Sequence, residues 1–275
     1  MAFIDELNAA VGDIGRIPRV RFEAGLSAEA SHWIRKKHLD GMVHEPGTLG
    51  ALMAIAKCYP ESKTIFDIGA LYGYFALFAS MVFEKLDLTA FDMHPVAVKD
   101  LRENCAPFGI KCVNAVLTDE VKPAQVFWVS GFNIYEEPLG GWEELKTIPG
   151  AMKERGYQNR GRFFAKVKFT TLDEYCATNP PPDVMKIDVE GYQAKCLQGG
   201  MNTIEAYKPV IVIELHDPDK LERFGVTNKS TVQPLFDLGY RGYWCGNFRD
   251  KDAVFEPVDE MTEKHEKLSI MVLHA

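Results

Sequence analysis

Acidic side chains and a histidine follow two apolar runs late in the chain. Asp188 and Glu190 follow VMKI and precede Gly191, and Glu214 and His216 alternate at the end of VIVIELH. Carboxylates at the ends of buried strands cost free energy unless a partner or ligand uses their charge. Because carboxylates and imidazoles take up protons and bind metal ions, this pattern predicts general-base or metal-assisted chemistry.

A second motif, DIGALYG, follows an earlier apolar run. Gly69 permits a sharp turn, Gly73 lets the backbone approach a ligand, and Asp92 ends the next run, where an acid commonly accepts ribose hydroxyls. A nicotinamide-binding loop would need further glycines where this chain has Leu71 and Tyr74. The motif therefore favours an adenosine ligand with a small anion, such as a carboxylate, at the helix N-terminus.

Both motifs lie in a chain that alternates short apolar runs with helical patterns. We expect strands over 64–69, 86–92 and 110–116, then 183–188 and 209–216, and last 241–246 and 267–275, the final one as an inserted antiparallel edge. Such alternation is typical of a doubly wound sheet, whose ligands bind at the carboxyl ends of the strands. Two further strands, expected over 124–130 and 162–172, flank a stretch rich in glycine and aromatic residues.

The predicted fold is therefore α/β, a doubly wound, seven-stranded, mostly parallel Rossmann-like sheet. A helical segment over 1–60 packs on this core, the sheet domain covers 61–275, and an insertion of about 121–170 follows the third strand. Two helices are expected before the sheet, over 27–41 and from a cap at Thr48.

Composition narrows the class of protein. The chain has 275 residues, 47% of them hydrophobic, which suffices for one sizeable core, and its net charge of −8 argues against a nucleic-acid-binding surface. It shows no long apolar run, no signal-peptide pattern and six cysteines without a C-x-x-C pair. We expect a cytoplasmic protein without nucleic-acid or membrane partners, with a homo-oligomer through the N-terminal helices as an open option.

From about Glu45 to Glu214, the sequence resembles the FkbM family of class I S-adenosylmethionine-dependent methyltransferases. The similar segments are HEPGTLGALMAI, IFDIGALYGYFAL, AFDMHPVAVKDLREN, TTLDEY, MKIDVEG and IVIELH. Leu71 and Tyr72 replace the smaller Asn-Ile common in the family's turn, and Asp92 and Met93 replace its usual Glu-Pro. The insertion follows no alignable pattern, so the resemblance does not supply the acceptor.

The resemblance implies S-adenosylmethionine as the cofactor. Asp67 and the glycine turn would line its methionine part, Glu45 would bind its amino group, and Asp92 its ribose. Met93 would lie against the adenine. The cofactor residues expected in this way are Glu45, Asp67, Gly69, Ala70, Gly73, Asp92, Met93, Asn114 and Asp188.

Methyl transfer to a hydroxyl also requires removal of a proton. We expect Asp188, His216 and Glu214 to be the catalytic residues, and two mechanisms stay open. Either His216 or Asp188 is the general base, or Asp188 with Glu214 or Asp217 holds a Mg²⁺ ion that orients a diol. Simpler roles are also open: Glu190 could only cap the next helix, and Glu214 could only pair with Lys186.

The predicted activity is S-adenosylmethionine-dependent O-methylation of a sugar or of another natural-product or glycan acceptor. One alternative is a nucleotide-dependent oxidoreductase, which the residues at 71 and 74 count against. Another is a non-catalytic cofactor-binding module, which Asp188 and His216 count against. Aromatic residues and arginines of the insertion, such as Trp128, Tyr135 and Arg162, would suit a carbohydrate.

Overall fold

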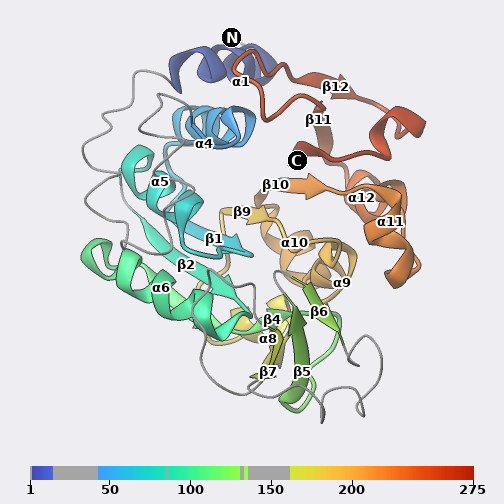
Figure 1. The fold of residues 1–275 in the computed structure, drawn as a ribbon. Coiled ribbons are helices and arrows are strands. Elements are labelled where there is room, and N and C mark those ends of the chain that lie inside the picture. The colour runs from blue at the N-terminus through green and yellow to red at the C-terminus, as the bar shows by residue number, and fades with distance from the viewer. Residues whose placement is uncertain (1, 15–42, 85, 131–132, 136–161) are drawn as a thin grey trace.

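The computed structural model describes residues 2–14, 43–84, 86–130, 133–135 and 162–275, drawn in colour in Figure 1. Within these residues the main sheet has eight strands in the order β12-β11-β13-β10-β9-β1-β2-β3. Their bounds are β1 Thr64–Ile68, β2 Asp87–Asp92, β3 Lys111–Asn114, β9 Val184–Ile187, β10 Val210–Leu215, β11 Arg241–Cys245, β12 Glu256–Val258 and β13 Ser269–His274. The ladders from β10 through β9, β1 and β2 to β3 are parallel, which confirms the doubly wound α/β fold.

Two details of the sheet differ from the prediction. The eighth strand, β12, was not predicted, because it is only three residues long, contains Pro257 and has no apolar run. It lies at the sheet edge, where a residue without an N–H is tolerated. The last strand, β13, is antiparallel as expected, but it lies between β10 and β11 and not at an edge. Its first five residues are all buried, as expected for a strand with neighbours on both sides.

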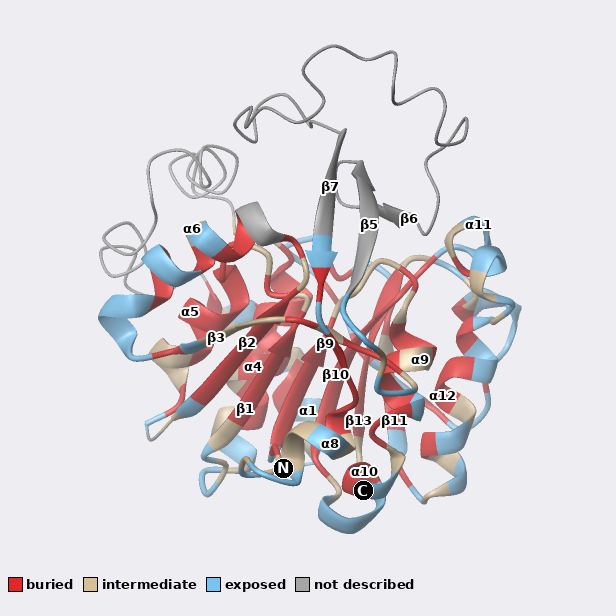
Figure 2. Ribbon diagram, turned by 90° about the horizontal axis from the view of Figure 1, so that it is seen from below, coloured by how far each residue is buried: buried red, intermediate tan, exposed pale blue. Residues whose placement is uncertain are grey.

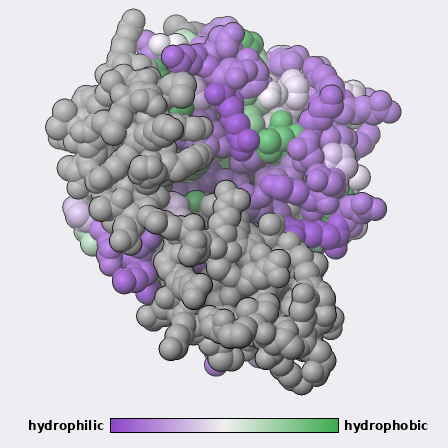
Figure 3. Space-filling model, viewed as in Figure 1, coloured by the Kyte–Doolittle hydropathy of each residue, from purple (hydrophilic) through white to green (hydrophobic). Residues whose placement is uncertain are grey.

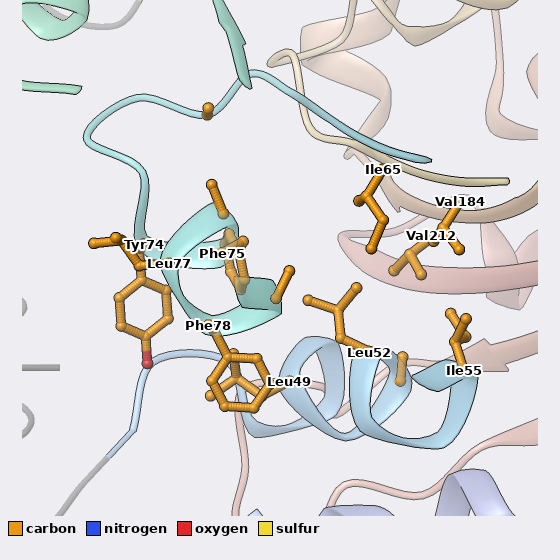
Figure 4. Packing of buried hydrophobic residues seen from close by; sticks show 14 of the residues in the cluster. Leu49, Leu52, Ile55, Ile65, Tyr74, Phe75, Leu77, Phe78, Val184 and Val212 are labelled. Carbon is orange, nitrogen blue, oxygen red and sulfur yellow. The ribbon is translucent and has the colours of Figure 1, made fainter. Parts of the chain in front are cut away.

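Helices cover both faces of this sheet, so the domain has three layers. One face packs against α1 Phe3–Asp13, α4 Pro46–Cys58, α5 Tyr74–Val82 and α6 Pro95–Cys105. The other packs against α8 Leu172–Cys176, α9 Gln193–Gln198, α10 Met201–Tyr207 and α12 Asn228–Asp237. Figure 2 shows the buried strands between outer helices that are partly exposed. Figure 4 shows Leu52 of α4 directed toward Ile65 and Val212 of the sheet. No helix in the described part of the chain is long and apolar enough to cross a membrane.

The ends of the insertion lie side by side. Strand β4 (Val116–Leu117) pairs with β8 (Phe169–Thr170), which joins the chain before and after the insertion. Between them, β5 (Gln125–Ser130), β6 (Asn133–Tyr135) and β7 (Arg162–Val167) form a separate antiparallel sheet, as the sequence predicted for the flanking strands. The helix expected over 27–41 and the rest of the insertion lie outside the described residues. The domain boundary near residue 60 stays a prediction.

Helix α4 starts earlier than expected because of a close backbone contact. It begins at Pro46 with Glu45 as its N-cap, so the prediction of Thr48 as cap was wrong; the Thr48 hydroxyl instead donates to the Glu45 carboxylate. The Gly47 N–H donates to the Phe248 carbonyl at 2.7 Å, and a methyl group on Gly47 would lie 2.8 Å from Phe248 Cα. Only glycine therefore allows the turn that follows β11 to lie against the start of α4.

We predict that Gly47→Ala lowers the free energy of unfolding by about 1–3 kcal/mol, because the added methyl group overpacks a contact with backbone atoms. The matched control is Gly12→Ala in α1, an exposed position where an added methyl group meets nothing within 4 Å. That variant should be more stable by about 0.5–1 kcal/mol, since alanine favours the helix. Denaturant titrations of both variants measure this, and equal effects would contradict the proposed contact.

Candidate active site

Strained backbone marks three turns near the carboxyl ends of the strands. Glu45, Leu71 and Glu190 have φ angles of 50°, 50° and 53°, in the left-handed region that side chains other than glycine rarely adopt. Glu45 precedes α4, Leu71 follows β1, and Glu190 follows β9. Such strain persists where surrounding contacts hold it, and it clusters at functional sites. The three turns therefore direct attention to the groups between them.

A buried lysine lies at the centre of these groups. The sheet register pairs Asp67 of β1 with Lys186 of β9, and the Lys186 ammonium lies 3.4 Å from the carboxylates of both Asp67 and Asp188. It also lies 4.5 Å from the centroid of the Phe75 ring. Burial disfavours its charge, but the surrounding carboxylates outweigh this and raise the pKa of Lys186 above its ordinary value. Lys186 is therefore a permanent buried cation.

A second cation, Arg249, joins two buried carboxylates from distant parts of the chain. Its guanidinium lies 3.2 Å from Glu45 Oε1 and 3.3 Å from Glu214 Oε1. Burial alone would raise the pKa of Glu45, but His44, Arg249 and Lys186 together hold it below its ordinary value. For Glu214, burial dominates and the carboxylates of Asp188 and Glu45 add to it, so its pKa is raised. Glu214 thus contacts Arg249, and the pairing with Lys186 that the sequence left open is not the ion pair in the structure.

Carboxylates outnumber cations in this cluster. Its acids are Glu45, Asp67, Asp188 and Glu214. The basic groups in contact with them are Lys186, Arg249 and the His44 ring, which lies 3.2 Å from Glu45 Oε1. Three of the acids are buried, and Asp188 keeps 22% of its side chain exposed. Burial raises the pKa of Asp67 and of Glu214, and a bound cation would favour the charged forms of both carboxylates. Figure 3, which shows the face seen in Figure 1, has mostly hydrophilic side chains on its coloured part, around a smaller hydrophobic patch.

The predicted ribose ligand, Asp92, also holds the turns beside it. Its Oδ2 accepts the Leu71 N–H at 2.8 Å, and its Oδ1 accepts the His94 N–H at 2.7 Å. Burial raises the pKa of Asp92 to about 6, although both N–H groups oppose that shift. Each oxygen keeps a lone pair, so the carboxylate can still accept hydroxyl groups of a ligand.

The glycine turn packs tightly against strand β9. A methyl group on Gly69, which has φ +84°, would lie 1.7 Å from the Asp188 carbonyl oxygen, so only glycine fits there. The N–H groups of Gly69 and Ala70 both donate to the Phe91 carbonyl at 2.9 Å. These two N–H groups are therefore not free for an anion. The sequence-based expectation concerned the N-terminus of the helix that follows, α5. The turn links β1, β2 and β9 at the point where their carboxyl ends meet.

The remaining predicted cofactor residues lie beside this turn. Gly73, with φ +90°, is the N-cap of α5, and a methyl group there would lie 2.8 Å from Cys105 Sγ. The Asn114 amide donates to the carbonyls of Asp92 and Met93 at 2.9 and 3.0 Å, which fixes the backbone after β2. Met93 is half-buried there. The residues predicted for the adenosine end are thus neighbours in the structure.

The predicted catalytic residues also come together. Asp188, Glu214 and His216 each place one ligand-type atom within 4.8 Å of the others. Asp217 is not one of that group; it is exposed, and its carboxylate accepts the Leu268 N–H at 3.0 Å. Glu190 does not cap helix α9, whose N-cap is Tyr192.

Glu190 instead binds side chains of its own. Its carboxylate contacts the Lys220 ammonium and lies 3.5 Å from His216 Nε2, and its backbone carbonyl accepts from Arg223 at 2.8 Å. The neighbouring His216 ring and the Lys220 ammonium lower the pKa of Glu190 to about 2, against the opposing effect of burial. These contacts explain how its strained backbone is held.

The group formed by Asp188, Glu214 and His216 does not suit the predicted metal ion. Asp188 already contacts Lys186, and Glu214 already contacts Arg249, so two of the three candidate ligands are paired within the protein. The His216 Nδ1 atom is engaged with the Gln193 amide at 2.8 Å. We therefore derive no catalytic step through a metal ion.

Sequence reasoning missed Arg249 and Gln193. Arg249 lies in the turn after β11, far from Glu45 and Glu214 in sequence, and no local pattern connects it with them. Gln193 looks like an ordinary helix residue, yet it is 2% exposed and contacts the His216 ring. Only the packing of the folded chain brings these residues to the site.

This sheet, with a glycine turn after its first strand and an acid ending its second, is the fold of Rossmann-like methyltransferases. The model of the methyltransferase FkbM domain matches residues 67–241 of the chain. The protein therefore belongs to the FkbM methyltransferase domain family, as its sequence motifs predicted. No curated protein sequence matches it.

Several solved structures are similar in fold. A methyltransferase FkbM from Methylobacillus flagellatus KT is 11% identical, with 97% of this chain and 61% of that chain covered and a TM-score of 0.43. The precorrin-6y C5,15-methyltransferase from Geobacter metallireducens GS-15 is 15% identical over 77% and 79%, with a TM-score of 0.38. An O-methyltransferase from Bacillus cereus, solved with SAH, is 11% identical over 98% and 96%, with a TM-score of 0.39.

We predict that Arg249→Met destabilises the protein by roughly 1–3 kcal/mol at pH 7.5, because two buried carboxylates lose their shared donor. The folded-state pKa of Glu214 is raised, so its charge is costly above that pKa and is neutralised as the pH falls. The part of the penalty that comes from Glu214 should therefore shrink as the pH falls from 7.5 to 5, whereas the part from Glu45 should persist, because the pKa of Glu45 is held below its ordinary value.

Urea titrations at both pH values measure this penalty. The matched control is Arg102→Met in α6, which replaces an exposed arginine and should change stability by less than about 0.5 kcal/mol at either pH. A penalty for Arg249→Met that is independent of pH would contradict this account.

Proposed function

We propose that this methyltransferase uses S-adenosylmethionine and transfers its methyl group to a hydroxyl of a small acceptor, such as a sugar or another natural product. The observation that carries the proposal is the excess of carboxylates beside the glycine turn and Asp92. S-adenosylmethionine carries a sulfonium and an ammonium group, and both positive charges suit such a cluster. The oxidoreductase alternative has no comparable support, and the family match favours methyl transfer.

In this proposal, one set of residues binds the cofactor and another carries out the methyl transfer. Asp92 accepts the ribose hydroxyls, while Glu45 and Asp67 lie at the end of the site suited to the amino group. Met93 and the backbone held by Asn114 border the adenine. When bound, S-adenosylmethionine supplies an electrophilic methyl group on a sulfonium.

Asp188 is the proposed general base. Among the clustered acids it keeps the largest exposed fraction, and the Lys186 ammonium lies 3.4 Å from its carboxylate. The Asp188 carboxylate would take up the proton that the acceptor hydroxyl loses on methylation. The insertion between β4 and β8 is the proposed acceptor-binding segment, and a cytoplasmic location stays part of the proposal.

A calorimetric titration with S-adenosylmethionine, S-adenosylhomocysteine and NAD tests the cofactor. We predict binding of the first two and none of NAD; tight NAD binding without binding of the sulfonium would refute the proposal. Asp188→Asn should keep cofactor affinity within about twofold but lower turnover on a panel of hydroxylated acceptors at least 100-fold, since a general base contributes about 10²–10⁴. An equal loss of cofactor binding in this variant would contradict the division of roles.

We predict that cofactor affinity falls as the pH drops through about 6, because Asp92 is then protonated and loses acceptor capacity. If only the ionised form binds, the apparent Kd rises about tenfold at pH 5. Asp92→Asn should bind weakly at all pH values, and Asp87→Asn, at the exposed start of the same strand, should keep the wild-type dependence. Calorimetry from pH 5 to 8 measures the cofactor affinity of all three proteins. If Asp92→Asn shows the same pH dependence as the wild type, Asp92 is not the source of that dependence.

A further inference from the structure

The buried amide of Gln193 lies between strand β10 and the His216 ring. Gln193 is the first residue of α9, and its Nε2 lies 2.7 Å from the Glu214 backbone oxygen and 2.8 Å from His216 Nδ1. A backbone carbonyl only accepts hydrogen bonds, so the amide atom facing it is the NH₂ group. Both hydrogens of that group are therefore used, one on Glu214 O and one on His216 Nδ1.

This arrangement fixes where the His216 ring carries its proton. Because Nδ1 accepts a hydrogen bond, neutral His216 carries its hydrogen on Nε2. The surroundings of Nε2 agree, because Glu190 Oε2 lies 3.5 Å from it. Oxygens of Asp188 and Glu214 also lie within 4.8 Å of one of the two ring nitrogens. Carboxylate oxygens attract a hydrogen and repel a nitrogen lone pair.

The backbone around the ring is held equally firmly. His216 N–H donates to Asn228 Oδ1 at 3.2 Å, and Asn228 Nδ2 donates to the His216 carbonyl at 2.8 Å. His216 itself is 1% exposed. Its Nε2 makes no aligned hydrogen bond with any side chain of the described residues, although it lies beside the proposed base.

We propose that Gln193 is a positioning residue that holds His216 as an Nε2–H donor toward the acceptor; this rests on the proposed function. His216 is then not the general base, and that role falls to Asp188. Donation to the attacking oxygen would withdraw electron density from it, so the Nε2–H suits a second oxygen of the acceptor, as in a vicinal diol. Nε2 also does not bind a metal ion, because its lone pair is absent.

Imidazole ¹⁵N NMR of the whole protein at pH 7.5 tests the assignment. The His216 signals, identified by their loss in His216→Asn, should show a protonated Nε2 and an unprotonated Nδ1. A protonated Nδ1, alone or together with Nε2, would overturn the proposal. One equivalent of Zn²⁺ should leave both signals unchanged, and a shift of Nε2 to a metal-bound position would also overturn it.

Substitution of Gln193 gives the second arm of the test. In Gln193→Glu the new carboxylate accepts a hydrogen, so Nδ1 should become protonated; an unchanged spectrum would refute the role of Gln193. Gln198→Glu, an exposed position on the same helix, is the matched control and should leave the His216 signals as in the wild type. If Gln193→Glu fails to fold, Gln193→Met removes both donors, and the preference for Nε2–H should weaken.

The NMR readout needs neither cofactor nor turnover, so it separates this proposal from the proposed function. If the protein fails to bind S-adenosylmethionine but shows a protonated Nε2, the proposed function is contradicted and the role of Gln193 is supported. If the protein binds S-adenosylmethionine but shows a protonated Nδ1, the role of Gln193 is contradicted and the proposed function is supported.

Discussion

The buried ammonium of Lys186 is the charge on which the other groups of the site depend. It lies 3.4 Å from Asp67 and from Asp188, and only its presence makes two carboxylates tolerable under the carboxyl edge of the sheet. The parallel register of β1 and β9 sets this contact, because it places Asp67 directly beside Lys186. Fold and site are thus linked through one cross-strand pair.

Arg249 plays the same part at the periphery of the sheet, where it contacts two further carboxylates. Glu45 before α4 and Glu214 on β10 share its guanidinium, and the close approach of Gly47 to Phe248 brings it to them. The result is a cluster with more acids than cations, in which Asp188 alone is substantially open to solvent. Such a site attracts a cationic ligand and leaves one carboxylate free to take up a proton. This combination is the physical basis of the proposed methyl transfer.

Much of this could be predicted from the sequence, because it depends on local patterns. Alternating apolar runs and helix caps predicted the parallel strands β1, β2, β3, β9 and β10, and the motif ends placed Asp188, Glu214 and His216 at one edge. The edge strand β12, the internal position of β13 and the contacts of Arg249 and Gln193 could not be predicted. They depend on register and packing between segments far apart in the chain, for which a single sequence carries no periodic signal.

The most direct test of the account is a crystal structure of the protein with S-adenosylhomocysteine. The account predicts the ribose hydroxyls on the Asp92 carboxylate, the amino group at the Glu45 and Asp67 end of the cluster, and the sulfur on the side of Asp188. A ligand bound elsewhere, or one whose ribose makes no contact with Asp92, would contradict the central claim that this carboxylate cluster is the cofactor site of a methyltransferase.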